Sequence, residues 1–211
     1  MATNLEPNIV CNVLNSNKIN FYKTGIDHGT ITAVIDEYKF EITSLREDVS
    51  TDGRHANVKF STSWKQDASR RDFTINSIYS DINGNLFDPY NGKNDLEKGC
   101  INFIGDPDKR IKEDYLRILR YLRFFIAYSK QSHNTQLIRK LKSNIEGVSM
   151  LSKDRLLDEL QKLINAKTLE KLSKDKTCME LISIIFPELK NINIFSKLNS
   201  IKREIIENLS L

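Results

Sequence analysis

From Ile111 onward the apolar residues recur at helical spacing, and this pattern constrains the fold more than any other feature of the chain. Residues three or four apart share one face of an α-helix. The stripe consists of Ile111, Tyr115, Ile118, Leu119, Leu122, Phe125 and Ile126. It predicts an amphipathic helix that begins near Ile111. Further short helices are expected over 152–166, 168–174, 178–186 and 201–211.

The residues before this stripe alternate as β-strands do. Two β-rich runs, 28–35 and 38–45, are separated by Asp36-Glu37 and predict an antiparallel hairpin. Asn83-Gly84 predicts a second hairpin, because both residues tolerate tight hairpin turns. The expected fold is therefore an α+β head over residues 1–108, followed by an all-α region over 109–211.

A helix is also expected from about Ala68 to Ser77, with Asp67 as its N-cap. The nearby Arg70, Arg71 and Asp72 could hold phosphate and ribose hydroxyls, although a capped, charged first turn is the commoner meaning. Asp106-Pro-Asp108 is the single Asp-x-Asp of the chain, the usual spacing for a two-metal site. Its place before a helix favours capping.

Composition places the chain among globular proteins, with 211 residues, 39% hydrophobic and 28% charged. No run of about 20 apolar residues predicts a membrane span, and the three scattered cysteines suit a reducing cytoplasm. Residues 1–110 carry 13 Lys and Arg against 16 Asp and Glu, whereas residues 111–211 carry 19 against 12. The basic second half suits contact with nucleic-acid phosphates, or else is a solvated helical surface. The histidines and cysteines show no metal-ligand spacing.

Asp114 and Arg117 are three residues apart, which places them on one face of the expected helix. One interpretation is an ion pair between them. The other comes from base chemistry, because adenine and cytosine each present an amine beside a ring-nitrogen acceptor. A carboxylate accepts from the amine, and a guanidinium donates to the ring nitrogen. Arg120 and Arg123, further along the helix, would then face a triphosphate.

Six ordered motifs resemble one family, and they cover roughly residues 1–128. They are Thr24-Gly25-x-x-His28-Gly29-Thr30, Glu41-Ile-Thr-Ser-Leu45-Arg46, Asp52-Gly53-Arg54-His55, Arg70-Arg71-Asp72-Phe73-Thr74-Ile75-Asn76, Asp88-x-x-x-Gly92-x-x-Asp95-Leu96, and Arg110-Ile111-x-Glu113-Asp114-Tyr115-Leu116-Arg117-Ile118-Leu119-Arg120. Together they resemble class II CCA-adding tRNA nucleotidyltransferases and bacterial poly(A) polymerases, of the polymerase-β-like superfamily. The later helices would correspond to the neck and part of the body of such enzymes.

The resemblance implies a role for each matching residue. Arg71 and Asp72 match the motif that holds ribose and triphosphate. Asp114 and Arg117 match the protein template that pairs with ATP or CTP. Arg120 and Arg123 match phosphate-binding arginines. Glu41 matches a catalytic acidic residue near the metal site, or is a solvent-facing strand residue.

The chain departs from the family at its start. The resemblance implies a Gly-Gly-x-x-Arg-Asp turn and an Asp-x-Asp strand that holds Mg²⁺. Residues Met1 to Pro7 resemble the stretch immediately after that strand, and neither motif is present in the head. The expectation is therefore a fragment truncated at the N-terminus, and at the C-terminus as well, without a metal site of its own and inactive alone. A separate peptide would then supply the missing strand.

The function implied is template-independent addition of CCA to tRNA 3′ ends from CTP and ATP. The segment Thr24 to Thr30 is closer to the CCA-adding form than to the poly(A) form. Two alternatives stay open: a poly(A) polymerase fragment, and a non-catalytic module that binds nucleotide or RNA.

Overall fold

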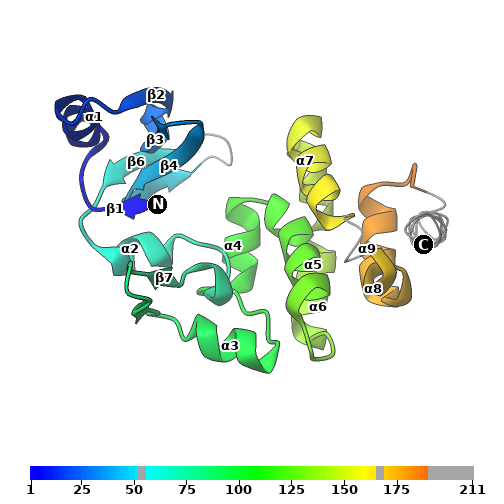
Figure 1. Ribbon diagram of the computed structural model, residues 1–211. Coiled ribbons are helices and arrows are strands. Elements are labelled where there is room, and N and C mark those ends of the chain that lie inside the picture. Colours follow the sequence, from blue (N-terminus) through cyan, green and yellow to red (C-terminus); the bar gives the residue numbers. More distant parts are fainter. Residues whose placement is uncertain (52–55, 165–168, 190–211) are drawn as a thin grey trace, which may run out of the picture. The chain divides into compact units, whose positions relative to one another are not determined.

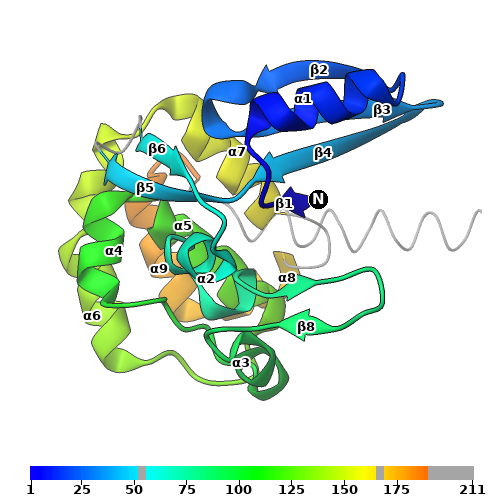
Figure 2. The same ribbon diagram turned by 90° about the vertical axis from the view of Figure 1, so that its left-hand side faces the viewer.

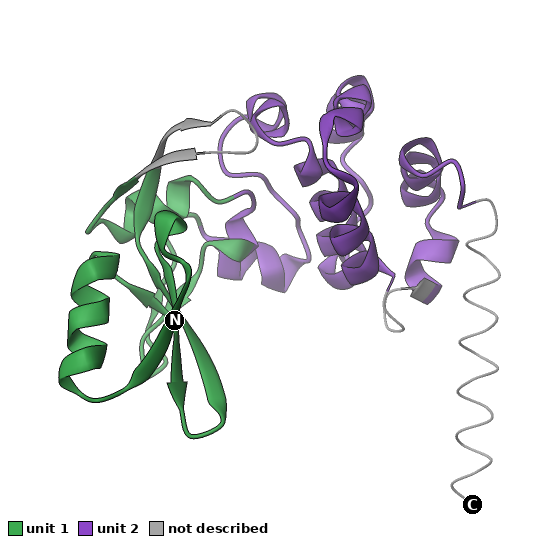
Figure 3. Cartoon of the chain, turned by 90° about the horizontal axis from the view of Figure 1, so that it is seen from above, with its two compact units in different colours: residues 1–71, 76–90 green, residues 72–75, 91–211 purple. Residues whose placement is uncertain are grey.

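The structure is a computed structural model, and it describes residues 1–51, 56–164 and 169–189. The chain divides into two compact units, shown in different colours in Figure 3. The first comprises residues 1–71 and 76–90, and the second comprises residues 72–75 and 91 onward. The motif expected at Asp52 to His55 and the helix expected over 201–211 lie outside the described residues.

The first unit is built on a mixed four-stranded sheet (Figure 1). Its strands are β1 (Ala2–Thr3), β2 (Asn20–Gly25), β3 (Thr30–Ile35) and β4 (Tyr38–Ser44), in the order β1-β4-β3-β2. The hairpin predicted around Asp36-Glu37 is confirmed: β3 and β4 are antiparallel, and Ile35 pairs with Tyr38. Asp36 takes the positive φ of 54° that this tight turn requires.

One face of this sheet is covered by α1 (Pro7–Ser16), which contacts β2 and β3 (Figure 2). The small core between them consists of Val10, Cys11, Leu14, Ile31 and Ala33. Side chains along a strand point alternately to the two faces of the sheet, so Thr32, which lies between Ile31 and Ala33, points to the face opposite α1. That face carries Tyr22, Thr32 and Glu41, which are neighbours in the β2-β3-β4 register.

The rest of the first unit consists of short elements. β5 (Arg46–Thr51) and β6 (Ala56–Phe60) form an antiparallel pair, and α2 (Trp64–Ser69) follows. β7 (Tyr79–Ser80) and β8 (Leu86–Phe87) form the second predicted hairpin, and Gly84 has the φ of 84° that its turn needs.

The helix expected from Ala68 to Ser77 is wrong. The helical residues are Trp64–Ser69, and Ser63 is the N-cap, since its side chain accepts a hydrogen bond from the Gln66 amide. A separate 3-10 turn covers Thr74–Asn76. Between them Phe73 forms a β-bridge with Phe103, which pulls the chain out of helical geometry. Tertiary pairing therefore overrides the local signal.

The second unit is helical. Its helices are α3 (Gly92–Lys98), α4 (Pro107–Glu113), α5 (Leu116–Tyr128), α6 (Thr135–Ser143), α7 (Lys153–Leu163), α8 (Leu169–Lys174) and α9 (Lys176–Ile185), with a 3-10 segment over Ile145–Met150. The expected helices over 152–166, 168–174 and 178–186 are confirmed within the described residues. α6 was not expected, although Asn134 caps it. An α+β head followed by a helical region is the observed fold class.

The expected helix through Ile111 is two helices. Asp114 takes an extended conformation, with φ −156° and ψ 105°, and ends α4. Its side chain accepts a hydrogen bond from the amide of Leu116, the first residue of α5, whose N-cap is Tyr115. The apolar stripe still forms one core, because Ile111 and the α5 residues converge on the same cluster.

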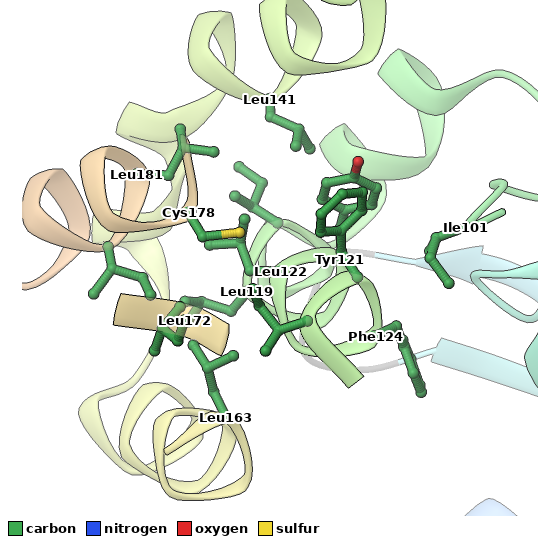
Figure 4. Packing of buried hydrophobic residues seen from close by; sticks show 14 of the residues in the cluster. Ile101, Leu119, Tyr121, Leu122, Phe124, Leu141, Leu163, Leu172, Cys178 and Leu181 are labelled. Atoms are coloured by element: carbon green, nitrogen blue, oxygen red, sulfur yellow. The ribbon is translucent and has the colours of Figure 1, made fainter. Parts of the chain in front are cut away.

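α5 is the centre of that core (Figure 4). Ile118, Leu119 and Leu122 are fully buried, and Leu163, Leu172 and Leu181 reach them from α7, α8 and α9. Burial of such side chains stabilises a fold by roughly 1.5–3 kcal/mol each. None of the helices in the described residues is long and apolar enough to cross a membrane.

The segment 72–75 packs closely against the start of α3, and the lack of a side chain at Gly92 permits this contact. A Cβ on Gly92 would lie 2.1 Å from the Thr74 carbonyl oxygen, so only glycine permits this approach. The Thr74 hydroxyl donates to Asp95 at 2.6 Å. These contacts attach the segment that contains Asp72 to α3.

Candidate nucleotide-binding site

The candidate residues divide between the two units. Glu41 and Arg71 belong to the first, and Asp72, Asp114, Arg117, Arg120 and Arg123 belong to the second.

Glu41 lines a hollow of about 550 Å³ on the open face of the sheet. Thr24, Thr32, Tyr22 and Lys39 line it too, and Thr24 and Thr32 are hydrogen-bonded at 2.9 Å. Mg²⁺ prefers several oxygen ligands, and two-metal sites use more than one carboxylate. Glu41 is the single carboxylate that lines this hollow within the described part of the chain, so these side chains do not fit a magnesium site by themselves.

Arg71 is held by a buried carboxylate. Asp67, 1% exposed, accepts from Arg71 Nη2 at 3.2 Å and from Arg70 Nη2 at 2.7 Å. The hydroxyl of Tyr79 also donates to Asp67, and the Arg71 guanidinium lies 5.3 Å from the centre of the Tyr79 ring. The Asp67 side chain therefore orients two guanidinium groups instead of capping a helix.

Electrostatics keep this carboxylate charged. Burial alone would raise the pKa of Asp67, but the hydrogen bond from Tyr79 and the charges of Arg70 and Arg71 outweigh it, so the pKa lies below its ordinary value of 3.8. Burial and the bond to Asp67 raise the pKa of Tyr79 to about 12. The tyrosine thus stays a hydrogen-bond donor at neutral pH.

Asp72 and Arg120 are brought together from 48 residues apart in the sequence. Asp72 is 5% exposed, and Arg120 donates to it through Nε. Burial disfavours the charged form of Arg120, yet the hydrogen bond and charge of Asp72 outweigh it and hold its pKa above its ordinary value. The two predicted site residues therefore form one ion pair.

Glu159 on α7 extends this network. Its side chain is 2% exposed and accepts from Arg123 Nε, and it lies 4.0 Å from Arg120 Nη1. The Arg123 guanidinium also stacks 4.2 Å from the centre of the Phe124 ring. One buried carboxylate therefore fixes the side chains of two arginines on α5.

Asp114 and Arg117 pair with other residues rather than with each other. Asp114 accepts from Arg155 of α7 at 2.8 Å. Arg117 donates through Nη1 to Glu113 at 2.7 Å and to the Arg110 carbonyl at 2.6 Å. The ion pair between Asp114 and Arg117, one of the two interpretations of their spacing, is absent among the described contacts. The break between α4 and α5 explains this, because the two residues no longer share one helix.

Asp106-Pro-Asp108 is a cap, as its position before a helix favoured. Asp106 accepts from the Lys109 amide at 3.0 Å and begins α4. Asp108 pairs with Lys112 at 2.6 Å and accepts from Asn144 at 2.8 Å. Both carboxylates are occupied by helix contacts.

Sequence reasoning missed Asp67 as an anchor, and also Glu113, Arg155 and Glu159. Glu159 and Arg155 lie on α7, and charged residues of this kind are common on the surfaces of helices. Only the packing of α7 against α5 makes these two part of the site. A charged residue in the apolar positions of α7 is the one signal that could have indicated Glu159.

The arrangement in the second unit is a row of guanidinium groups along α5, at three-residue intervals, each fixed by a carboxylate. Each guanidinium group has five N–H donors. A guanidinium that is paired with a carboxylate can therefore also donate to further acceptors such as phosphate oxygens. Asp114 adds an acceptor at the start of the row. Such a set can hold a polyanion and a base edge, which is the chemistry of a nucleotide-binding protein.

Residues 1–102 match the family described as poly A polymerase head domain. The chain is 47% identical over 142 residues to the human mitochondrial CCA tRNA nucleotidyltransferase 1, covering 66% of this chain and 33% of that protein. It is 39% identical over 142 residues to the CCA-adding enzyme of Staphylococcus epidermidis, covering 66% and 35%. The chain spans about a third of the length of these relatives.

Solved structures resemble the fold. The CCA-adding enzyme of Bacillus stearothermophilus, in complex with CTP, aligns with a TM-score of 0.70 and 24% identity, over 92% of this chain and 47% of that one. A tRNA nucleotidyltransferase with a primer tRNA and an incoming ATP analogue aligns with a TM-score of 0.67 and 21% identity, over 96% and 58%. Residues 1–102 therefore belong to the poly A polymerase head domain family, and the chain is similar to CCA-adding enzymes over 142 residues.

The Asp67 network predicts an acid-dependent loss of stability. The folded pKa of Asp67 is depressed, so its contribution is present above 3.8 and is lost as pH falls through the lower folded value. We expect Asp67→Asn to destabilise the chain at pH 7, and the difference from wild type to shrink as pH falls below 3.8. Urea unfolding of both proteins at pH 7, 5 and 3 measures it. A difference that is constant with pH would contradict the charge-based explanation.

Two substitutions on α7 test the network formed by Glu159, Arg120 and Arg123. Glu159→Gln removes the charge that two arginines share, and we expect it to lower the free energy of unfolding by roughly 1.5–3 kcal/mol. Asp158→Asn is the matched control, because the Asp158 side chain is 65% exposed and pairs only with Lys162 among the contacts described; we expect a change within about 0.5 kcal/mol. Equal effects of the two substitutions would show that Glu159 has no special role. Denaturant unfolding provides the measurement.

Proposed function

We propose that this chain is the nucleotide-recognition and RNA-handling part of a CCA-adding tRNA nucleotidyltransferase. It would select CTP and ATP for addition to the 3′ end of tRNA. The named relatives are CCA-adding enzymes, and the neighbouring structures were solved with CTP, or with tRNA and an ATP analogue. The basic second half of the chain supports contact with RNA phosphates.

The observation that carries the proposal is the row formed by Arg117, Arg120 and Arg123 on α5. Glu113, Asp72 and Glu159 hold these arginines. Holding a long side chain in one conformation before the ligand arrives lowers the entropy cost of binding. The row is therefore preorganised for a triphosphate, in which Arg120 and Arg123 would contact phosphate oxygens.

Asp114 and Arg117 would select the base. Asp114 is 25% exposed, and each of its oxygens already accepts one hydrogen bond, from the Leu116 amide or from Arg155. A carboxylate has about four acceptor sites, so each oxygen can still accept from a base amine. Guanine and uracil present a carbonyl at that place, which would leave a buried polar group unpaired at a cost of about 1–3 kcal/mol.

Arg71, Asp72 and Glu41 have supporting roles in this proposal. Arg71 would contact ribose or triphosphate, with Asp67 and Tyr79 fixing its guanidinium. Asp72 would orient Arg120 through their ion pair, and its own carboxylate would contact the ribose or triphosphate. Glu41 is proposed as an acidic residue near the reacting phosphates. Mg²⁺, which supplies charge neutralisation in such reactions, would need carboxylates beyond those lining the Glu41 hollow.

Poly(A) addition is the second candidate function, because the matched head-domain family is named for poly A polymerase. The segment Thr24 to Thr30 favours CCA addition. In the structure it forms the end of β2, a 3-10 turn at Ile26–His28, and Gly29 with a φ of 84°. A Cβ on Gly29 would lie 2.9 Å from the Phe60 ring, so the turn requires glycine. We place the protein in the cytoplasm on its scattered free cysteines.

Nucleotide selection can be measured on this chain directly. We expect ATP and CTP to bind more tightly than GTP and UTP, because only adenine and cytosine satisfy Asp114 and Arg117. Asp114→Asn should reduce that preference about tenfold, since an amide can donate to the carbonyl of the wrong bases. Asp154→Asn, on the first turn of α7, is the control and should leave the preference unchanged. Isothermal titration of the four nucleotides is the measurement. An unchanged preference in Asp114→Asn would contradict the assignment.

Transfer to RNA tests the reaction itself. Among the residues that the structure describes, Glu41 is the one carboxylate that lines its hollow, so we expect negligible incorporation of labelled CTP and ATP into tRNA lacking its CCA when the chain acts alone with Mg²⁺. Addition of a peptide with the Gly-Gly-x-x-Arg-Asp turn and the Asp-x-Asp strand should restore it. Incorporation by the chain alone would contradict the single-carboxylate argument. A poly(A) tail on RNA that already ends in CCA would favour the second candidate function.

A further inference from the structure

Three potential metal ligands lie together in the second unit, away from the arginine row. His133 is in the loop between α5 and α6, Asp175 is the N-cap of α9, and Cys178 is in the first turn of α9. His133 Nε2 lies 3.1 Å from both carboxylate oxygens of Asp175 and 3.7 Å from the Cys178 sulfur. One ligand atom from each residue lies within 4.8 Å of the others.

These separations suit a single small ion. Zinc binds nitrogen and oxygen near 2.0–2.2 Å and sulfur near 2.3 Å, so neighbouring ligands around a tetrahedral ion lie about 3.3–3.6 Å apart. The observed nitrogen–oxygen and nitrogen–sulfur separations of 3.1 and 3.7 Å are close to that range. Small side-chain rotations would therefore centre an ion between the three atoms.

The surroundings orient the ligands. The His133 ring stacks on Phe125, with centroids 3.6 Å apart and planes 14° apart. Its Nδ1 lies 3.2 Å from the Tyr121 hydroxyl. A metal-binding histidine usually donates a hydrogen bond from its other ring N–H to an oxygen atom, which leaves the first nitrogen free to bind the ion. Cys178 is fully buried, with its side chain directed into the core beside Tyr121 and Leu122 (Figure 4).

We propose that His133, Asp175 and Cys178 form a binding site for a divalent transition-metal ion, with Zn²⁺ the best-matched ion. Thiolate and imidazole ligands favour zinc and cobalt over magnesium and calcium, which prefer oxygen. Three protein ligands leave a fourth position for water. The ion would join the loop after α5 to the start of α9, 42 residues further along the chain.

A metal-free arrangement uses the same atoms differently. In that case His133 Nε2–H donates to Asp175, and Asp175 accepts from the Cys178 amide at 2.8 Å as a helix cap. In this arrangement the Cys178 thiol is hydrogen-bonded to the Asp175 carboxylate and lies 3.7 Å from His133 Nε2. The two arrangements therefore differ in whether the Cys178 sulfur bonds to an added metal.

Cobalt titration of the full chain, reduced and stripped of metal, separates them. Bound as proposed, one equivalent of Co²⁺ gives a sulfur-to-cobalt charge-transfer band and the intense visible bands of a tetrahedral site, and Zn²⁺ abolishes both. Cys178→Ser should remove the charge-transfer band, whereas Cys100→Ser, which changes a partly exposed cysteine outside the cluster, should keep it. Tyr121→Phe should weaken binding by roughly 10- to 100-fold.

Several outcomes would overturn the proposal. They are an absence of the charge-transfer band in wild type, retention of the band in Cys178→Ser, and loss of the band in Cys100→Ser. The wild-type spectrum decides the matter even where a variant does not fold. Nucleotide binding is measured separately, so failure of this site leaves the proposed function standing, and the reverse also holds.

Discussion

The candidate site depends on the way buried carboxylates hold the arginines of α5. Asp72 and Glu159 are almost fully buried, and a buried charge without a partner is costly enough to unfold a domain. Arg120 and Arg123 supply those partners. The constraint acts in both directions, because the arginines are fixed in turn and their remaining donors point in defined directions. A row of cationic groups on a surface helix would otherwise be mobile and solvated.

The apolar core makes this network possible. α5 carries its charged row on one side and its buried stripe, which includes Leu119 and Leu122, on the other. The stripe sets the rotation of the helix about its axis, because only one rotation buries it. That rotation decides which side α7 meets, and α7 brings Glu159 to Arg123 and Arg155 to Asp114. Packing thus positions the polar contacts rather than the reverse.

The first unit repeats the same principle on a smaller scale. Asp67 is surrounded by Arg70, Arg71 and Tyr79, and its depressed pKa follows from their charges and hydrogen bonds. The open face of its sheet carries Glu41 among threonines, whereas the other face is covered by α1. The two units therefore each present oriented charged groups on a packed scaffold, which is what the proposed nucleotide binding requires.

The sequence by itself determined the fold class, both hairpins, most of the later helices and the family, because periodicity, turn residues and ordered motifs are local properties of the chain. It also identified Arg120 and Arg123 as candidate ligands. Only the tertiary structure decided which residues they pair with, since Asp72 lies 48 residues from Arg120 and Glu159 lies 36 residues from Arg123. It likewise placed the helix break at Asp114, the true N-cap at Ser63, and the meeting of His133 with Cys178. Those features depend on packing between distant segments, and local spacing carries no signal for them.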